Sequence, residues 1–139
     1  MKRAHMLGAG ALLVCLGTVQ PCQAEEELAP GFDACMEKSG GVTVEMRMCL
    51  DQAYKYWDAE LNGNYSSAMN RCNDTDDPKA CKNRLRNAER LWVQYKEAMS
   101  DAIMGYEDGT MGPVLGADFL ARETKKQALE LGGVSGEGE

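Results

Sequence analysis

Two stretches decide the fold: TVEMRMCLDQAYKYWDAELNGNYSSAM (residues 43–69) and CKNRLRNAERLWVQYKEAMSDAIMGY (residues 81–106). In both, apolar residues recur at spacings of three and four, and in the second stretch charged residues occupy the other face. In the first stretch they are Met46, Cys49, Leu50, Ala53, Tyr54, Trp57, Leu61, Tyr65, Ala68 and Met69; in the second they are Cys81, Leu85, Ala88, Leu91, Trp92, Tyr95, Met99, Ala102, Ile103 and Tyr106. This spacing predicts two long amphipathic α-helices. No strand pattern of useful length appears, so we predict an all-α fold.

The two helices are separated by NDTDDP (residues 73–78). Asp77 is suited to cap the second helix, and Pro78 to its first turn, because the N–H that proline lacks would be unpaired there. Two long helices joined by a short turn lie antiparallel. We therefore expect a helical hairpin whose facing stripes form most of the core.

The segments around this hairpin are expected to be short. Residues 25–29 are acidic and predicted to be loose, and residues 30–38 can form a short helix. Residues 105–116 hold four glycines and one proline, which predicts a loop. A short helix is expected to begin at Asp118 and to end near Leu131. Residues 132–139 are predicted to be a flexible, Gly-rich tail.

The N-terminal residues 1–24 have the pattern of a secretory signal peptide. Lys2 and Arg3 are followed by a short apolar run from Leu7 to Val19, and the segment ends in Cys22-Gln23-Ala24. A permanent membrane helix needs roughly 20 apolar residues, which this run does not provide. We expect cleavage near Ala24 and a periplasmic or secreted protein.

Cys15 and Cys22 raise the alternative of a lipid-anchored protein. A lipoprotein signal carries a small residue directly before the acylated cysteine, and these positions hold Val14 and Pro21. The mature protein is therefore expected to have no membrane anchor.

The mature chain would have 115 residues, the size of one domain, with 13 Lys and Arg against 22 Asp and Glu. A net charge of −9 repels nucleic acid and attracts cationic partners. We therefore expect no nucleic-acid partner.

Four cysteines remain in the mature chain, at Cys35, Cys49, Cys72 and Cys81. An even number in a small exported domain predicts two disulfides. We favour Cys35–Cys49 and Cys72–Cys81, because either crossed pairing would force distant helix ends together. The only histidine leaves with the signal peptide and no Cys-x-x-Cys pair is present, so no metal and no cofactor are expected.

Enzymatic activity is not expected either. Without histidine the usual catalytic triads are excluded, and Asp58, Glu60, Glu89 and Glu97 are interpreted as solvated helix faces, not as paired catalytic carboxylates. The pair Met46 and Met48 could bind Cu(I), but core packing explains most methionines more simply.

Three motifs resemble one known family. The run Asp58-x-x-Leu61-Asn62-x-x-Tyr65 is similar to the D-x-x-L-N-x-x-Y signature of the LprI-type lysozyme-inhibitor domain. The run Leu85-Arg86-x-Ala88-Glu89-Arg90-x-Trp92-x-x-Tyr95-Lys96-x-Ala98 resembles its second block. Gly109-Thr110-Met111 with Leu120-Ala121-Arg122-x-Thr124 resembles its Gly-rich loop and closing helix. Together they cover about residues 33–131.

The resemblance implies a secreted or periplasmic helical protein with inhibition of lysozyme as its named activity. Cys35 and Cys49 stand where the family has its first cysteine pair. Ser100 and Phe119 stand where the family has its second, so Cys72–Cys81 would replace that bridge at the other end of the hairpin. The alternative function is a structural or stress-related envelope module without lysozyme activity.

We interpret the signature residues as mainly structural. Asp58, Asn62, Arg86 and Arg90 are expected to form a polar network bracing the hairpin, and Leu61, Tyr65, Trp92 and Tyr95 to fill its core. The predicted contacts with lysozyme or another basic protein are the acidic residues of two loops: Asp74, Asp76, Glu107 and Asp108.

Overall fold

The computed structural model describes residues 27–106 and 109–136. Within these residues the chain forms four α-helices and one 3₁₀ turn, and no strand. They are α1 (Phe32–Lys38), α2 (Thr43–Arg71), η1 (Cys72–Asp74), α3 (Pro78–Tyr106) and α4 (Met111–Gly136). The predicted all-α class is confirmed. The predicted signal peptide, residues 1–24, lies outside the described residues.

The hairpin of α2 and α3 has the predicted turn chemistry. The Asp77 carboxylate accepts a hydrogen bond from the backbone N–H of Ala80 at 2.9 Å, and α3 begins at Pro78. The disulfide Cys72–Cys81 ties this turn, and Cys35–Cys49 ties α1 to α2. Both favoured pairings are therefore present in the structure.

The C-terminal helix differs from the prediction. α4 has 26 residues and runs from Met111 to Gly136, so it is neither short nor preceded by a long loop, and it includes part of the predicted tail. Among the glycines predicted to form that loop, Gly109 has the positive φ of a turn, at 85°. Gly116 lies within α4, where an added Cβ would stand 2.6 Å from Met104 Cγ. Gly116 thus allows close approach of α4 to α3.

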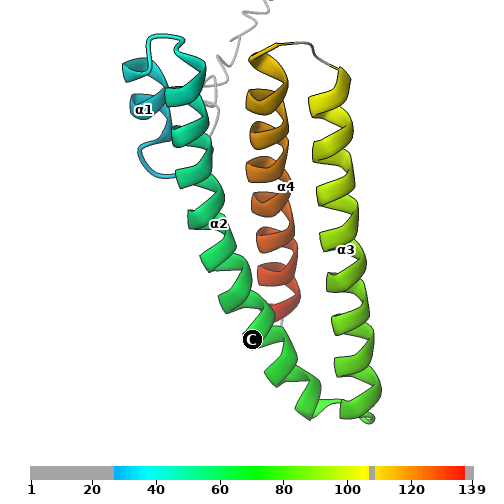
Figure 1. Ribbon diagram of the computed structural model, residues 1–139. Helices are drawn as coiled ribbons and strands as arrows, with labels where there is room; N and C mark the ends of the chain where they lie inside the picture. Colours follow the sequence, from blue (N-terminus) through cyan, green and yellow to red (C-terminus); the bar gives the residue numbers. More distant parts are fainter. Residues whose placement is uncertain (1–26, 107–108, 137–139) are drawn as a thin grey trace, which may run out of the picture.

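The length of α4 changes where the core lies. α4 runs between α2 and α3 and packs along both, while the hairpin helices diverge toward their open end (Figure 1). We predicted that the apolar stripes of α2 and α3 would pack mainly against each other, and this prediction is wrong. The facing surface for each hairpin helix is supplied mostly by α4.

Two apolar clusters fill this arrangement. The first joins Leu50 and Ala53 of α2 to Val114 and Ala121 of α4, with Leu28 and Ala29 packed on them. The second joins Leu61 to Ala128 and Leu131, nearer the hairpin turn. The prediction that residues 25–29 are loose is wrong for Leu28 and Ala29, which are 5% and 4% exposed. The Leu28 carbonyl accepts a hydrogen bond from Trp57 Nε1 at 2.5 Å.

Candidate functional site

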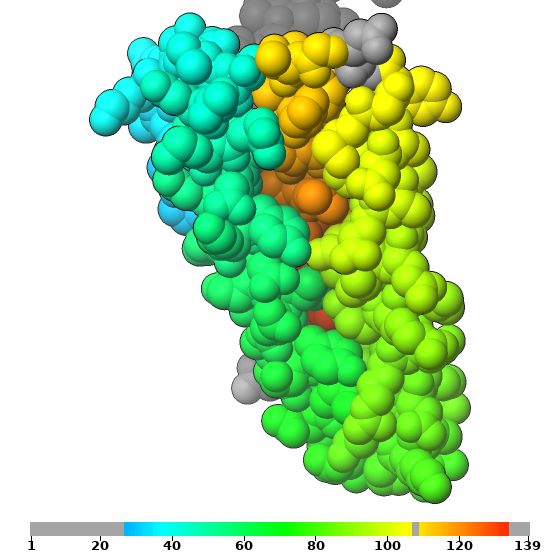
Figure 2. Space-filling view, in the orientation of Figure 1, coloured from blue at the N-terminus to red at the C-terminus, as the bar shows by residue number. Residues whose placement is uncertain are grey.

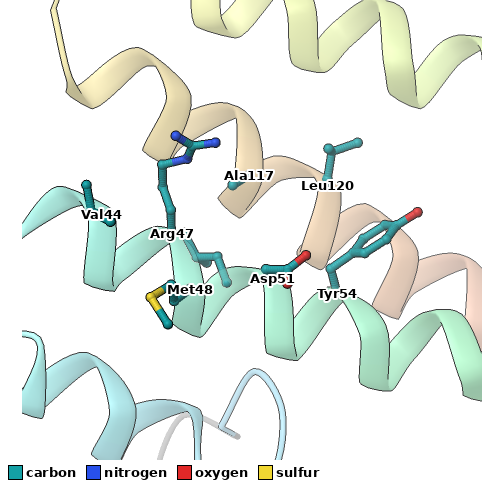
Figure 3. A pocket seen from close by; sticks show the side chains of 8 residues that line it. Val44, Arg47, Met48, Asp51, Tyr54, Ala117 and Leu120 are labelled. Carbon is teal, nitrogen blue, oxygen red and sulfur yellow. The ribbon is translucent and has the colours of Figure 1, made fainter.

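A surface groove lies between the first half of α2 and the first half of α4. Its volume is about 500 Å³. The α2 wall is formed by residues spaced as one helix face, and the α4 wall by two small or branched apolar residues (Figure 3). The lining residues are Val44, Arg47, Met48, Leu50, Asp51 and Tyr54 from α2, and Ala117 and Leu120 from α4. Figure 2 shows α4 recessed between α2 and α3 on this face of the molecule.

A buried lysine joins the two hairpin helices beside this groove. Lys96 of α3 is 6% exposed, and its Nζ donates a hydrogen bond to the Tyr54 hydroxyl at 3.1 Å. The same ammonium lies 4.5 Å from the ring centre of Trp92 and 4.9 Å from that of Tyr54. No carboxylate in the described part of the chain forms an ion pair with it. Aromatic faces and one hydroxyl therefore stabilise this charge.

Tyr54 is the α2 lining residue nearest the hairpin turn, so this contact lies at that end of the groove. At the rim, Asp51 accepts a hydrogen bond from Lys55 at 2.6 Å. The guanidinium of Arg47 extends over the groove toward α4 (Figure 3). The groove thus combines an apolar floor with polar groups of both signs at its edge.

The polar signature residues do not brace the hairpin as predicted. Asn62 Nδ2 donates to the Asp58 backbone carbonyl at 2.7 Å and to its carboxylate at 3.2 Å, both within α2. Arg86 and Arg90 donate to Asn83 and Asn87 of their own helix, α3. α4 lies between the two helices, so these faces do not meet. The expected inter-helix network is therefore absent among the described hydrogen bonds.

The apolar signature residues agree better with the prediction. Leu61 is 4% exposed, and Tyr65 and Trp92 pack against the second apolar cluster. Trp92 Nε1 donates to Glu123 of α4 at 3.2 Å. Tyr95 is the exception, because it is 49% exposed and lies at the bundle surface, edge-on to the Phe119 ring at 6.3 Å.

Sequence reasoning missed several polar residues that hold the helices together. Glu89 accepts a hydrogen bond from Gln127 at 3.0 Å, so one of the carboxylates assigned to a solvated face contacts α4. Asn64 donates to the Ala128 carbonyl at 2.9 Å, and Ser100 to the Gly116 carbonyl at 3.1 Å. One signal was present: Lys96 and Ser100 follow Trp92 at steps of four, which places them on the same helix face as a core tryptophan.

Of the four acidic residues predicted as partner contacts, the structure describes Asp74 and Asp76. Asp74 and Asp76 are exposed at the hairpin turn, before α3. Glu107 and Asp108 lie outside the described residues. A helix of 29 residues is roughly 43 Å long at 1.5 Å per residue. The turn with Asp74 and Asp76 therefore lies a full helix length from Tyr106, and contact of the four acidic residues with a partner stays a prediction.

The described residues form neither a metal-binding cluster nor a membrane-spanning helix. No group of three or more His, Cys, Asp or Glu side chains there is arranged to hold a metal ion. No helix of residues 27–106 and 109–136 is long and apolar enough to cross a membrane. Of the proposed Cu(I) pair, Met46 packs against the first apolar cluster, whereas Met48 is 58% exposed.

Fold and site together define a small, disulfide-bonded helical domain with one described groove of substantial size. The chain matches the family model "Lysozyme inhibitor LprI" over residues 35–131, and it belongs to the LprI lysozyme-inhibitor family. The match runs from the first disulfide cysteine to Leu131, a buried residue of the second apolar cluster.

The chain also has a relative among curated proteins. The chain is 30% identical over 98 residues to "Uncharacterized protein R02472" of Rhizobium meliloti (strain 1021). That alignment covers 63% of this chain and 70% of the relative. No solved structure matches the chain.

Proposed function

We propose that this protein binds and inhibits lysozyme in the periplasm or outside the cell, and that it catalyses no reaction itself. The observation that carries the proposal is the family match over residues 35–131. That range includes both disulfides, all of α2 and α3, and most of α4.

Charge supports the choice of partner. Lysozymes of host defence are typically basic, and the chain after residue 24 carries a net charge of −9. Opposite net charges steer two proteins toward each other and raise the rate of their encounter. Many acidic proteins share this property, so charge supports the family-based proposal and does not replace it.

The proposed compartment rests on two features of the chain. Disulfides form and persist in oxidising environments outside the cytosol, and the structure pairs all four cysteines of residues 25–139. The signal-peptide pattern of residues 1–24 agrees with the same location. Detecting the mature chain beginning at Glu25 in a periplasmic or culture fraction would test this part of the proposal.

Inhibition is tested by mixing the purified, oxidised domain with basic lysozymes and following the lysis of cell-wall suspensions. We expect dose-dependent protection that persists at about 0.15 M salt, where the Debye length is about 8 Å and loose charge pairing is screened. An unrelated acidic protein of similar size and charge is the control, and it should not protect. Lysis at the uninhibited rate with several lysozyme types would contradict the proposal and favour the envelope-module alternative.

A further inference from the structure

We propose that lysozyme is bound at the open end of the bundle, with a cationic segment of the enzyme lying over the groove between α2 and α4 and an apolar side chain entering it. This inference rests on the proposed function and assigns its contact surface. It places the contact at the open end, away from the hairpin turn that carries Asp74 and Asp76. Three features of the structure support it: exposed apolar area, charge and the groove itself.

The exposed large apolar side chains are concentrated at the open end. We divide the described chain at Trp57, Trp92 and Glu123, so that the open half comprises residues 27–57, 93–106 and 109–123 and the hairpin half comprises the remainder. Ten of the twelve such side chains lie in the open half, and only Leu91 and Leu129 lie in the hairpin half. Val44 and Met48 of this set line the same groove, and neighbouring exposed apolar side chains are typical of a binding surface.

Negative charge is also concentrated in the open half. The open half carries nine Asp and Glu against five Lys and Arg, and the hairpin half carries seven against eight. The exposed acids Asp74 and Asp76 precede α3, whose first turns carry Lys79 and Lys82. A positively charged partner is attracted to the open half and gains little at the hairpin turn.

The groove provides the place for an inserted side chain. Val44 and Met48 are 64% and 58% exposed at its α2 wall, so their apolar surface is still in contact with water. Leu120 contributes to the apolar lining. At the rim, Asp51 forms an exposed ion pair with Lys55, and a cation beside the inserted group would compete with Lys55 for that carboxylate. Burying such area in a central pocket with charges at its edge is how protein interfaces concentrate their binding energy.

The groove also offers the apolar contact that binding at moderate salt requires. Charge alone would give an encounter that salt screens, because exposed pairs interact weakly beyond a Debye length. Removal of the Met48 and Val44 surfaces from water does not depend on salt in this way. Protection that persists at physiological salt therefore requires an apolar contact, and this groove offers one within the acidic half of the bundle.

The test compares two substitutions with the same chemistry at different places. Met48→Lys changes a side chain in the groove, and Leu129→Lys changes one in the hairpin half of α4. The two side chains are 58% and 55% exposed, so both variants should fold, which circular dichroism and thermal unfolding would verify. We expect Met48→Lys to raise the concentration for half-inhibition of a basic lysozyme at least tenfold, and Leu129→Lys to change it less than twofold.

A second pair of variants tests which end of the bundle attracts lysozyme through its acidic residues. Asp101→Asn in the open half and Asp74→Asn at the hairpin turn each remove one exposed negative charge. At low salt we expect the association rate with lysozyme to fall two- to threefold for Asp101→Asn and to stay unchanged for Asp74→Asn.

The outcomes distinguish this inference from the proposed function. If the wild type inhibits and Met48→Lys inhibits equally well, the groove assignment is overturned and the proposed function stands. If the wild type neither binds nor inhibits any lysozyme, both are overturned. A wild type that self-associates at assay concentrations, with Met48→Lys restoring the monomer, would assign the groove to a second copy of this chain and overturn the lysozyme contact.

Discussion

The ammonium of Lys96 donates to the hydroxyl of Tyr54 at 3.1 Å and thereby joins α3 to α2 beside the groove. The two helices otherwise pack mainly on α4. A buried charge without an ion pair is costly, because its hydration is lost. The rings of Tyr54 and Trp92 offset part of that cost. Lys96 can stabilise the bundle through its charge or through its buried hydrocarbon stem, and substitutions at this position separate the two contributions.

We expect the stem to dominate. Lys96→Ala removes buried methylenes and should lower the free energy of unfolding by about 2 kcal/mol. Lys96→Met keeps most of that volume and also removes the desolvation cost, so it should stay within about 1 kcal/mol of the wild type. Urea unfolding followed by circular dichroism measures both. Equal losses in the two variants would show instead that the charge carries the stabilisation.

Thr124 gives a second prediction from burial. It is fully buried in α4, and its hydroxyl has no hydrogen-bond partner among the described residues. Thr124→Val keeps the shape and removes the unpaired hydroxyl, so we expect the free energy of unfolding to rise by about 1 kcal/mol. Thr124→Ala is the control, because it removes the hydroxyl but also leaves a void and should destabilise. Destabilisation by the valine variant would mean that the hydroxyl does have a partner.

The elements that could be predicted from the sequence are those specified by local chemistry. Asp77 and Pro78 mark the start of α3, and the apolar spacing identifies α2 and α3. The disulfide pairing followed from this hairpin, because the neighbouring cysteines lie at its turn and at the junction of α1 with α2. All of these inferences used contacts between residues close in sequence.

The position of α4 could not be predicted in the same way. Gly112 and Gly116 suggest a loop, yet both are buried inside the helix, and at Gly116 the lack of a side chain admits Met104. Glycine is needed at position 116 because of Met104, which belongs to a different helix, α3. The groove was missed for the same reason, since its walls come from α2 and α4. Lys96 was assigned no role because a lysine is expected at the surface.

Gly63 provides a test of local helix stability that is independent of packing. It lies inside α2, and an added Cβ would have no atom within 4 Å. We therefore expect Gly63→Ala to raise the free energy of unfolding by about 1 kcal/mol, chiefly by restricting the unfolded chain. Gly31→Ala is the contrasting variant, because its φ of 79° is strained for any residue with a side chain, and it should destabilise. Thermal unfolding of both variants would decide, and a lower midpoint for Gly63→Ala would contradict the prediction.

The disulfide Cys35–Cys49 gives the last prediction, because α1 depends on it more than any other helix does. α1 has seven residues, none of them buried, and it packs mainly on α2. The double variant Cys35→Ala, Cys49→Ala should lower the free energy of unfolding by about 3 kcal/mol, as expected for a loop of this length. Its distinctive effect should be local: amide hydrogen exchange across residues 32–38 should accelerate more than exchange in the cores of α2 and α4. Cys72→Ala with Cys81→Ala is the matched control, since it should cost a similar free energy while accelerating exchange at the hairpin turn. If α1 exchanges at the same rate in both double variants, its contacts with α2 hold it in place without the covalent link.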